Sequence, residues 1–243
     1  MKRVQKTIRE AQSLNKLLKA AESNYLKFLQ GPKQFVIPIY QRTYSWTTKH
    51  CTQLWNDIIS ASEDDSKGHF IGSIVYIQGG IYQSSAISEL VVIDGQQRLV
   101  TLSLLLKVLG KALDEQKIED TINSKKIANY YLINNEEEDE AIRRKLVLTA
   151  SDRDTLTSLI DEKELPQTYS SQVVQNYKFF EDKVRKNQID LKKLYSGINR
   201  LFIVDISLER GKDNPQLIFE SLNSTGLDLS QADLIRNYVL MGL

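Results

Sequence analysis

The sequence has little of what several familiar kinds of chemistry require. Its 243 residues include one cysteine, Cys51, and two histidines, His50 and His69. A single cysteine excludes an internal disulfide framework and is typical of a reducing cytoplasm, where we expect the protein to be located. Two histidines are too few for a nuclease site built on a histidine cluster, unless one is recruited singly. No spacing supports a nucleophile made of Cys51 and a histidine.

A phosphate-binding loop, a membrane span and an excess of charge of one sign are also absent from the sequence. The pattern G-x-x-x-x-G-K-[ST] does not occur, which excludes the P-loop NTPases. The most apolar stretch, residues 99–109, is interrupted by Thr101, Ser103 and Lys107 and is too short to cross a bilayer. Lys and Arg number 32 against 31 Asp and Glu. Any DNA contact must therefore come from a local basic patch and not from bulk charge.

The apolar pattern predicts an α+β protein with one large core or a core with a helical annex, since 41% of the residues are hydrophobic. Helical spacing predicts a first helix over residues 14–29, ended by Gly31 and Pro32. Thr47 or Thr48 is placed to cap a helix through Trp55. Further strands are predicted at 34–39, 70–78, 90–93, 144–148 and 201–208, and further helices at 97–113, 171–186 and 190–199.

These elements suggest a division of the chain into three parts. We expect a core at residues 1–114, a mostly helical insertion at 115–200, and a closing strand and helices at 201–243 that complete the core. The strands would form a small sheet at each end of the sequence. The last predicted helix is still running at residue 243, which favours a domain excised from a longer protein. The sequence does not determine whether the chain forms a homo-oligomer.

The sharpest motif joins a predicted strand to a predicted helix through Asp94-Gly95-Gln96-Gln97-Arg98. The amino end of a helix offers unpaired backbone N–H groups and a positive dipole end, which suit a phosphate. Gly95 allows close approach of the backbone, and Arg98 in the first turn could bind phosphate oxygens as a fork. Asp94 could hold Mg²⁺ or a ribose hydroxyl. The alternative is a tight turn in which Asp94 caps the helix and Arg98 lies on the surface.

A second motif, residues 37–46, places aromatic, Arg and Gln side chains in a loop led by Pro38. Aromatic rings beside Arg can stack on bases and bind phosphates. Pro38 favours extended backbone, so we expect Tyr40 and Arg42 on one face and Gln41 on the other, next to the Asp94–Arg98 turn. In the alternative reading Tyr44 and Trp46 are core anchors, while Gln41 and Arg42 are solvated.

A third motif runs from residue 219 to 226 and continues at 233–237. Glu220, Asn223 and Asn237 could bind metal, ribose or base, and Arg236 could pair with phosphate. The alternative is a corner between two helices, in which Asn223 and a following glycine shape the turn.

Taken in this order, the motifs resemble the N-terminal domain of the GmrSD family of modification-dependent restriction endonucleases. The resemblance is carried by residues 37–46, 72–75, 92–102, 219–223, 226 and 233–237. It implies a fold similar to ParB and sulfiredoxin: a small mixed sheet with flanking helices, and a Gly-x-x-Arg-like turn that cradles nucleotide phosphates. Gly95 and Arg98 match that turn. Residues 115–200, where such families diverge, carry little of the resemblance.

The resemblance further implies a bacterial anti-phage system in which an NTP, bound with Mg²⁺, licenses a nuclease on a separate C-terminal domain. That domain looks like a His-Asn-His nuclease in relatives. The DNA sensed would be modified phage DNA, with glucosylated hydroxymethylcytosine or phosphorothioate as cues between which the resemblance does not choose. The preferred base of the NTP also stays open.

With the resemblance added, we expect catalytic roles for Asp94, Gln97 and Arg98. Arg98 and the helix amides would bind the triphosphate, Asp94 would hold Mg²⁺ or position water, and Gln97 would orient the nucleotide or the attacking water. Other nucleotide contacts are expected from Gly95, Gln96, Gln41, Arg42, Asn223, Arg236 and Asn237; DNA contacts from Tyr40, Arg42 and Tyr44; and a further metal contact from Glu220.

Two rival functions remain at this level. One is a binding module in which the nucleotide is a switch ligand without turnover. The other is a DNA-binding or nicking domain that acts through residues 40–46. We expect no DNA cleavage by this chain alone, because the nearest candidate, Asp114-Glu115-Gln116-Lys117, is typical of the solvated end of a helix.

Overall fold

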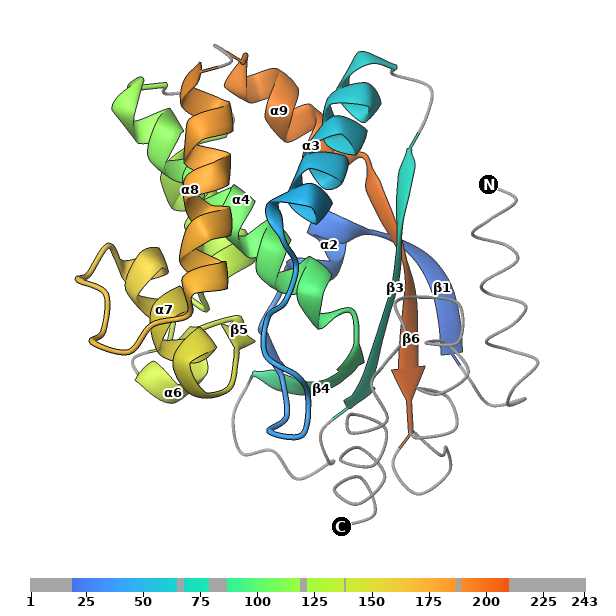
Figure 1. The fold of residues 1–243 in the computed structure, drawn as a ribbon. Helices are drawn as coiled ribbons and strands as arrows, with labels where there is room; N and C mark the ends of the chain where they lie inside the picture. The colour runs from blue at the N-terminus through green and yellow to red at the C-terminus, as the bar shows by residue number, and fades with distance from the viewer. Residues whose placement is uncertain are drawn as a thin grey trace.

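The computed structural model describes residues 19–64, 68–78, 87–118, 122–137, 139–186 and 189–209 (Figure 1). These residues form a mixed sheet with helices packed against it, which confirms the predicted α+β class. Figure 1 shows α3, α4, α8 and α9 on one side of strands β1, β3 and β6. Within the described ranges, no helix combines the length and apolar character needed to cross a membrane.

One sheet collects strands from both ends of the sequence. Its described strands follow the order β1-β6-β3-β4-β2-β5. The pairs β1–β6 and β3–β4 are antiparallel, whereas β6–β3, β4–β2 and β2–β5 are parallel. The strand bounds are β1 Lys19–Asn24, β2 Lys33–Val36, β3 His69–Gln78, β4 Ser88–Asp94, β5 Leu146–Val147 and β6 Leu201–Leu208. The expected pair of small sheets is therefore wrong: apolar β6 has neighbours on both edges and joins the two ends.

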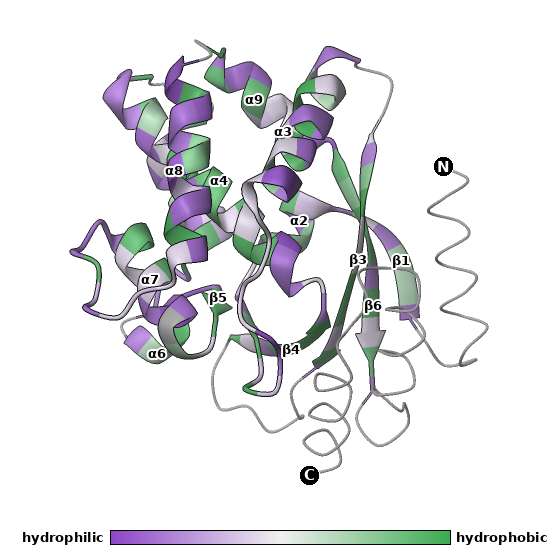
Figure 2. Cartoon of the chain, viewed as in Figure 1, coloured by the Kyte–Doolittle hydropathy of each residue, from purple (hydrophilic) through white to green (hydrophobic). Residues whose placement is uncertain are grey.

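The helices pack around α4, which is apolar on almost every side. Such a helix is stable only when it is buried, and the sequence from Leu99 to Leu113 is buried at nearly every position. Figure 2 shows hydrophobic residues along α4 and a mixture of hydrophobic and hydrophilic residues on α8, which packs against it. The bounds are α2 Tyr25–Leu29, α3 Thr48–Glu63, α4 Gln96–Glu115, α5 Ser124–Ile127, the π-helix η1 Ala128–Leu132, α6 Glu140–Arg143, α7 Ala150–Asp161, α8 Ser171–Lys186 and α9 Leu191–Asn199.

The segment predicted as an insertion contacts the core at several points. It supplies β5 to the edge of the sheet, and its helices α8 and α9 pack against α4 and α3. The predicted bounds of α8 and β6 are confirmed, and Thr47 caps α3 as expected, with His50 completing the cap.

The helix predicted over residues 14–29 is wrong for residues 19–24 and confirmed for residues 25–29. Residues Lys19–Asn24 are strand β1, and only α2 is helical, beginning where the Asn24 side chain accepts a hydrogen bond from the Lys27 backbone N–H (3.0 Å). All six residues of β1 find partners on β6, so sheet pairing outweighs the local helical pattern. The strand predicted at residues 34–39 is shorter than expected, because β2 ends at Val36, before Pro38.

Candidate functional site

The turn between β4 and α4 is shaped by Gly95, whose φ is +100°. A Cβ atom at this position would lie 2.9 Å from Cγ1 of Ile74 and 3.1 Å from the carbonyl oxygen of Ser73, so there is no room for a side chain. The Leu99 N–H donates to the Gly95 carbonyl oxygen (3.1 Å) and opens the helical hydrogen-bond ladder. The amides before Leu99 are those that a helix leaves without an internal acceptor, at its positive end.

Arg98 is held at this helix end by three contacts. Its Nη1 donates to the Ser73 carbonyl oxygen, and its Nη2 lies 3.7 Å from Oδ2 of Asp94. The guanidinium also lies over Gly72, where a Cβ atom would be 2.9 Å from both Cζ and Nε of Arg98. The Arg98 side chain is 21% exposed and lines a cleft. The guanidinium is therefore fixed by backbone groups and keeps a face toward solvent.

That cleft, of about 500 Å³, lies between α3 and the start of β3, a size typical of small-molecule sites. One wall carries the indole of Trp46 stacked on His50, with ring centroids 5.6 Å apart and an interplanar angle of 13°. His50, Gln53 and Asp57 follow at helical spacing along one face of α3. The lining residues are Trp46, His50, Gln53, Leu54, Asp57, His69, Phe70, Ile71, Gly72 and Arg98.

The loop at residues 37–46 turns where extended backbone was expected. The Gln41 N–H donates to the Pro38 carbonyl oxygen (3.0 Å), which closes a turn whose tip exposes 81% of Ile39. Gln41 is buried, and its Nε2 donates to the Ile93 carbonyl oxygen (2.9 Å). Tyr40 and Arg42 are partly exposed. Gln41 therefore does face away from Tyr40 and Arg42, but the predicted reason is wrong. The backbone forms a turn here and not an extended strand, and this turn directs the Gln41 side chain inward.

The two motifs nevertheless lie side by side, as the sequence predicts. Gln96 Nε2 donates to the Arg42 carbonyl oxygen (2.7 Å). Gln97 Oε1 accepts the backbone N–H groups of Ser45 (2.9 Å) and Trp46 (3.1 Å). Both glutamine side chains are buried and hold the loop in place. Their expected contacts with a nucleotide stay predictions.

Tyr44 is a core residue, which makes its predicted contact with DNA wrong. Its side chain is 5% exposed, and its hydroxyl is 2.7 Å from Oγ1 of Thr101 and accepts a hydrogen bond from Nδ2 of Asn176 (2.8 Å). Its backbone N–H donates to Oδ2 of Asp152 (2.6 Å). Burial raises the pKa of the Tyr44 hydroxyl, so it stays protonated. Of the two readings of this motif, the core anchor holds at Tyr44.

The cleft also contains a pair that sequence reasoning missed. Nε2 of His69, at the start of β3, lies 3.3 Å from Oδ2 of Asp57 on α3. Both side chains are about one third exposed, at 37% and 32%. The signal in the sequence is slight: His50, Gln53 and Asp57 form a polar edge on an amphipathic helix, which is usually a solvated face.

The remaining predicted site residues lie outside the described residues: Glu220, Asn223, Arg236 and Asn237. In the described part of the chain, no group of three or more His, Cys, Asp or Glu side chains is arranged to hold a metal ion. Asp94 is the predicted metal ligand that the structure places, and its side chain is 23% exposed.

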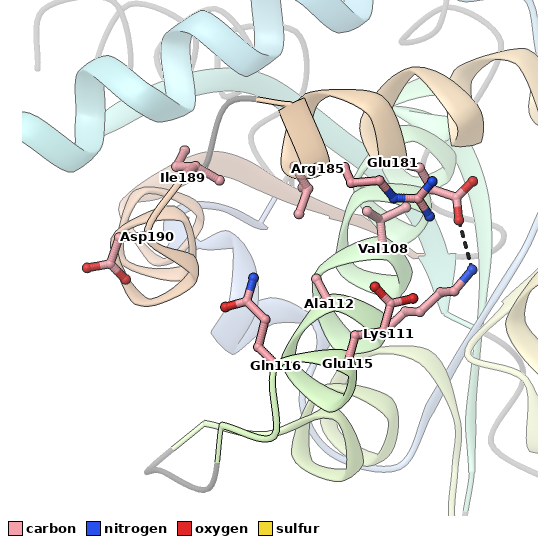
Figure 3. A pocket seen from close by; sticks show the side chains of 10 residues that line it. Val108, Lys111, Ala112, Glu115, Gln116, Glu181, Arg185, Ile189 and Asp190 are labelled. Atoms are coloured by element: carbon pink, nitrogen blue, oxygen red, sulfur yellow. Dashed lines mark hydrogen bonds and ion pairs between the residues drawn. The ribbon is translucent and has the colours of Figure 1, made fainter.

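A second cleft, of about 410 Å³, lies between α4 and α8 (Figure 3). Lys111 Nζ contacts Oε1 of Glu181 (2.9 Å) on one side, and Ile189 and Asp190 lie on the other. The hydrogen bond from Lys111 to Glu181 raises the pKa of Lys111. This cleft contains no residue of the three motifs, and three carboxylates line it beside two cationic side chains, so we place no nucleotide phosphate here.

Comparison with known families gives one match. The model described as the N-terminal domain of GmrSD restriction endonuclease matches residues 25–240, which include all three motifs. No curated protein matches the chain.

Proposed function

Since this chain belongs to the family of GmrSD restriction endonuclease N-terminal domains, we propose that it is the nucleotide-handling part of a restriction system. It binds and hydrolyses an NTP with Mg²⁺ and couples the sensing of modified phage DNA to a separate nuclease domain. The observation that carries this proposal is the fixed guanidinium of Arg98, which belongs to the first turn of α4 and lines the cleft between α3 and the start of β3.

The phosphates of the nucleotide are bound by the first turn of α4. A phosphate there accepts hydrogen bonds from backbone amides and is stabilised by the positive end of the helix. Arg98 adds charge-assisted hydrogen bonds, with its orientation already set by the Ser73 carbonyl oxygen and by Asp94. A guanidinium fixed before the ligand arrives loses little entropy on binding.

Asp94 is suited to share Mg²⁺ with the phosphates. Mg²⁺ in nucleotide sites is usually held by one or two carboxylates together with substrate phosphates and water. The Asp94 carboxylate is partly exposed and lies 3.7 Å from the Arg98 guanidinium, so it is close to the proposed phosphate site. The bound ion would neutralise phosphate charge during transfer.

The DNA-sensing surface is the exposed part of the loop beside α4. Arg42 and Tyr40 are partly exposed, and the backbone of Arg42 is tied to Gln96 at the first helical position. With a formal net charge of +1, the chain binds DNA through a few phosphate contacts, and this binding weakens steeply with added salt.

The test is isothermal titration with each NTP, with and without Mg²⁺, together with a phosphate-release assay. Arg98→Ala should weaken NTP binding by about 1.5–3 kcal/mol, which corresponds to a roughly ten- to a hundredfold increase in Kd. Arg153→Ala is the matched control, because it removes an arginine of a more exposed ion pair on α7. Equal NTP affinity in both variants would place the phosphate site elsewhere.

The rival functions give different results in the same assays. Tight NTP binding without phosphate release would indicate a nucleotide switch. Magnesium-dependent nicking of plasmid DNA by the chain alone would indicate a nuclease.

A further inference from the structure

The His69–Asp57 pair shares the cleft with Arg98 but belongs to none of the three motifs. His69 is the first residue of β3 and is positioned by its backbone N–H, which donates to the Arg200 carbonyl oxygen (2.9 Å). Asp57 faces it from α3, one helical turn beyond Gln53. Two separate elements therefore hold the carboxylate and the imidazole together.

The geometry gives the cleft two ends. β3 advances three residues from His69 to Gly72, about 10 Å at the rise of a strand, and Gly72 lies against the Arg98 guanidinium. α3 runs in the opposite direction beside β3 (Figure 1). His50 precedes Asp57 by seven residues, about 10 Å along the helix, and therefore lies toward the Arg98 end of the cleft. Arg98 and the Trp46–His50 stack thus mark one end, and the His69–Asp57 pair marks the other.

We propose that His69 accepts the proton of the attacking water during NTP hydrolysis and that Asp57 is its positioning residue. This inference rests on the proposed function: Arg98 binds the phosphates, and the terminal phosphate extends along the cleft toward His69. The imidazole touches the reacting water, whereas Asp57 acts only through His69.

The contact with Asp57 favours one form of the neutral imidazole ring. Oδ2 of Asp57 lies 3.3 Å from Nε2 of His69, and a carboxylate has no proton to donate, so the ring that carries its proton on Nε2 is favoured and Nδ1 is left as the acceptor. The water oxygen then bonds to the terminal phosphorus while the bond from that phosphorus to the bridging oxygen breaks. One water proton goes to Nδ1, and the products are NDP and inorganic phosphate. The imidazolium, stabilised by the Asp57 carboxylate, returns its proton to solvent.

Several charged and titratable groups line the cleft with His69 or lie on the elements next to it in the described structure. Asp57 and His50 lie on α3, and Arg98 lines the same cleft from α4. Arg200 precedes β6, and its Nη1 donates to the Ala61 carbonyl oxygen (2.9 Å). Asp57 is the group in direct contact with the imidazole, so its removal has the largest effect on proton transfer.

The experiment measures Kd for Mg·NTP by titration and phosphate release from pH 5 to 9, with and without DNA. His69→Gln keeps a side chain that can donate to Asp57 but cannot take up a proton. Its phosphate release should fall about a hundredfold with Kd unchanged. Asp57→Asn should lower the rate and alter its pH profile with Kd unchanged, because a neutral amide does not stabilise the imidazolium that forms when the water proton is taken up.

The matched control is Asp182→Asn, which removes the carboxylate of an ion pair with Lys186 on α8 (2.9 Å). It should leave both the rate and the pH profile unchanged. Wild-type rates in His69→Gln would overturn this inference and leave the proposed function standing. NTP binding without phosphate release by the wild-type chain would also overturn it, and would leave the binding half of the proposed function. Absence of NTP binding in the wild type would overturn both.

Discussion

Replacing Gly72 by alanine should weaken the proposed phosphate site without changing any residue that would bind the phosphate. Gly72 has a φ of +114°, and a Cβ atom there would lie 2.9 Å from Cζ and Nε of Arg98 and 3.1 Å from its Nη2. Real Cβ atoms do not approach other atoms so closely, so the guanidinium, at the end of a flexible side chain, has to move. The hydrogen bond from Arg98 to the Ser73 carbonyl oxygen is then lost.

Gly72→Ala has two costs, and a matched variant separates them. A positive φ costs a residue with a side chain about 1–2 kcal/mol in the folded state. Gly31 also has a positive φ, +85°, but a Cβ atom there would meet nothing within 4 Å. Gly31→Ala therefore carries the backbone strain alone. Both variants should unfold at lower urea concentration than the wild type, and Gly72→Ala at the lower of the two, because it also loses the hydrogen bond from Arg98 to Ser73.

NTP affinity should fall only in Gly72→Ala. If displacement of the guanidinium removes the whole charge-assisted interaction of Arg98 with phosphate, the binding free energy weakens by about 1.5–3 kcal/mol. Kd then rises about ten- to a hundredfold. The assay is isothermal titration with Mg·NTP at a temperature where both variants are folded. Equal affinities for the two variants would mean that the observed position of the Arg98 guanidinium has no part in phosphate binding.

Three other residues give separate predictions. Tyr44→Phe should lower the free energy of unfolding by about 1–3 kcal/mol in urea titrations, because buried polar partners lose their hydrogen bonds, and should leave DNA binding unchanged. Arg42→Ala should weaken DNA binding in fluorescence anisotropy and flatten its salt slope by about one unit; an unchanged slope would remove Arg42 from the DNA surface. Burial lowers the pKa of Lys145 from 10.5 to about 8, so the unfolded chain binds more protons between these values. The free energy of unfolding should therefore rise from pH 8 to 10, by on the order of 1 kcal/mol, and Lys145→Met should remove most of this rise.

Local patterns in the sequence were enough to predict the helices and strands that have a regular apolar face of their own. The helix Ser171–Lys186 and the strand Leu201–Leu208 have the predicted bounds because each presents a clear periodic apolar pattern. Strand Lys19–Asn24 was missed for the opposite reason. Its partner β6 lies about 180 residues further along the chain, and only that pairing makes the segment extended. The single sheet was missed with it, because strand order depends on the same distant contacts.

The site was predicted where the chemistry is local and missed where it depends on folding. The turn at Gly95 follows from a strand, a glycine and a helix in succession, and the structure has it. Burial of Tyr44 does not follow, since an aromatic residue in a polar loop can equally face solvent. The His69–Asp57 contact was also hidden, because one residue comes from a helix edge that resembles a solvated face and the other from the end of a strand.

Gln97 joins the proposed phosphate site and the proposed DNA-sensing loop in one network of hydrogen bonds. It lies one residue before Arg98, and its Oε1 accepts the N–H groups of Ser45 and Trp46. The Trp46 carbonyl oxygen in turn accepts hydrogen bonds from Gln172 (2.7 Å) and Asn176 (2.6 Å) on α8. A shift of the first turn of α4 on phosphate binding would break these bonds unless the loop moved with it, and an unpaired buried polar group costs about 1–3 kcal/mol. That energy is comparable to typical coupling between two binding sites, so the network is strong enough to link nucleotide state to the loop that is proposed to sense DNA.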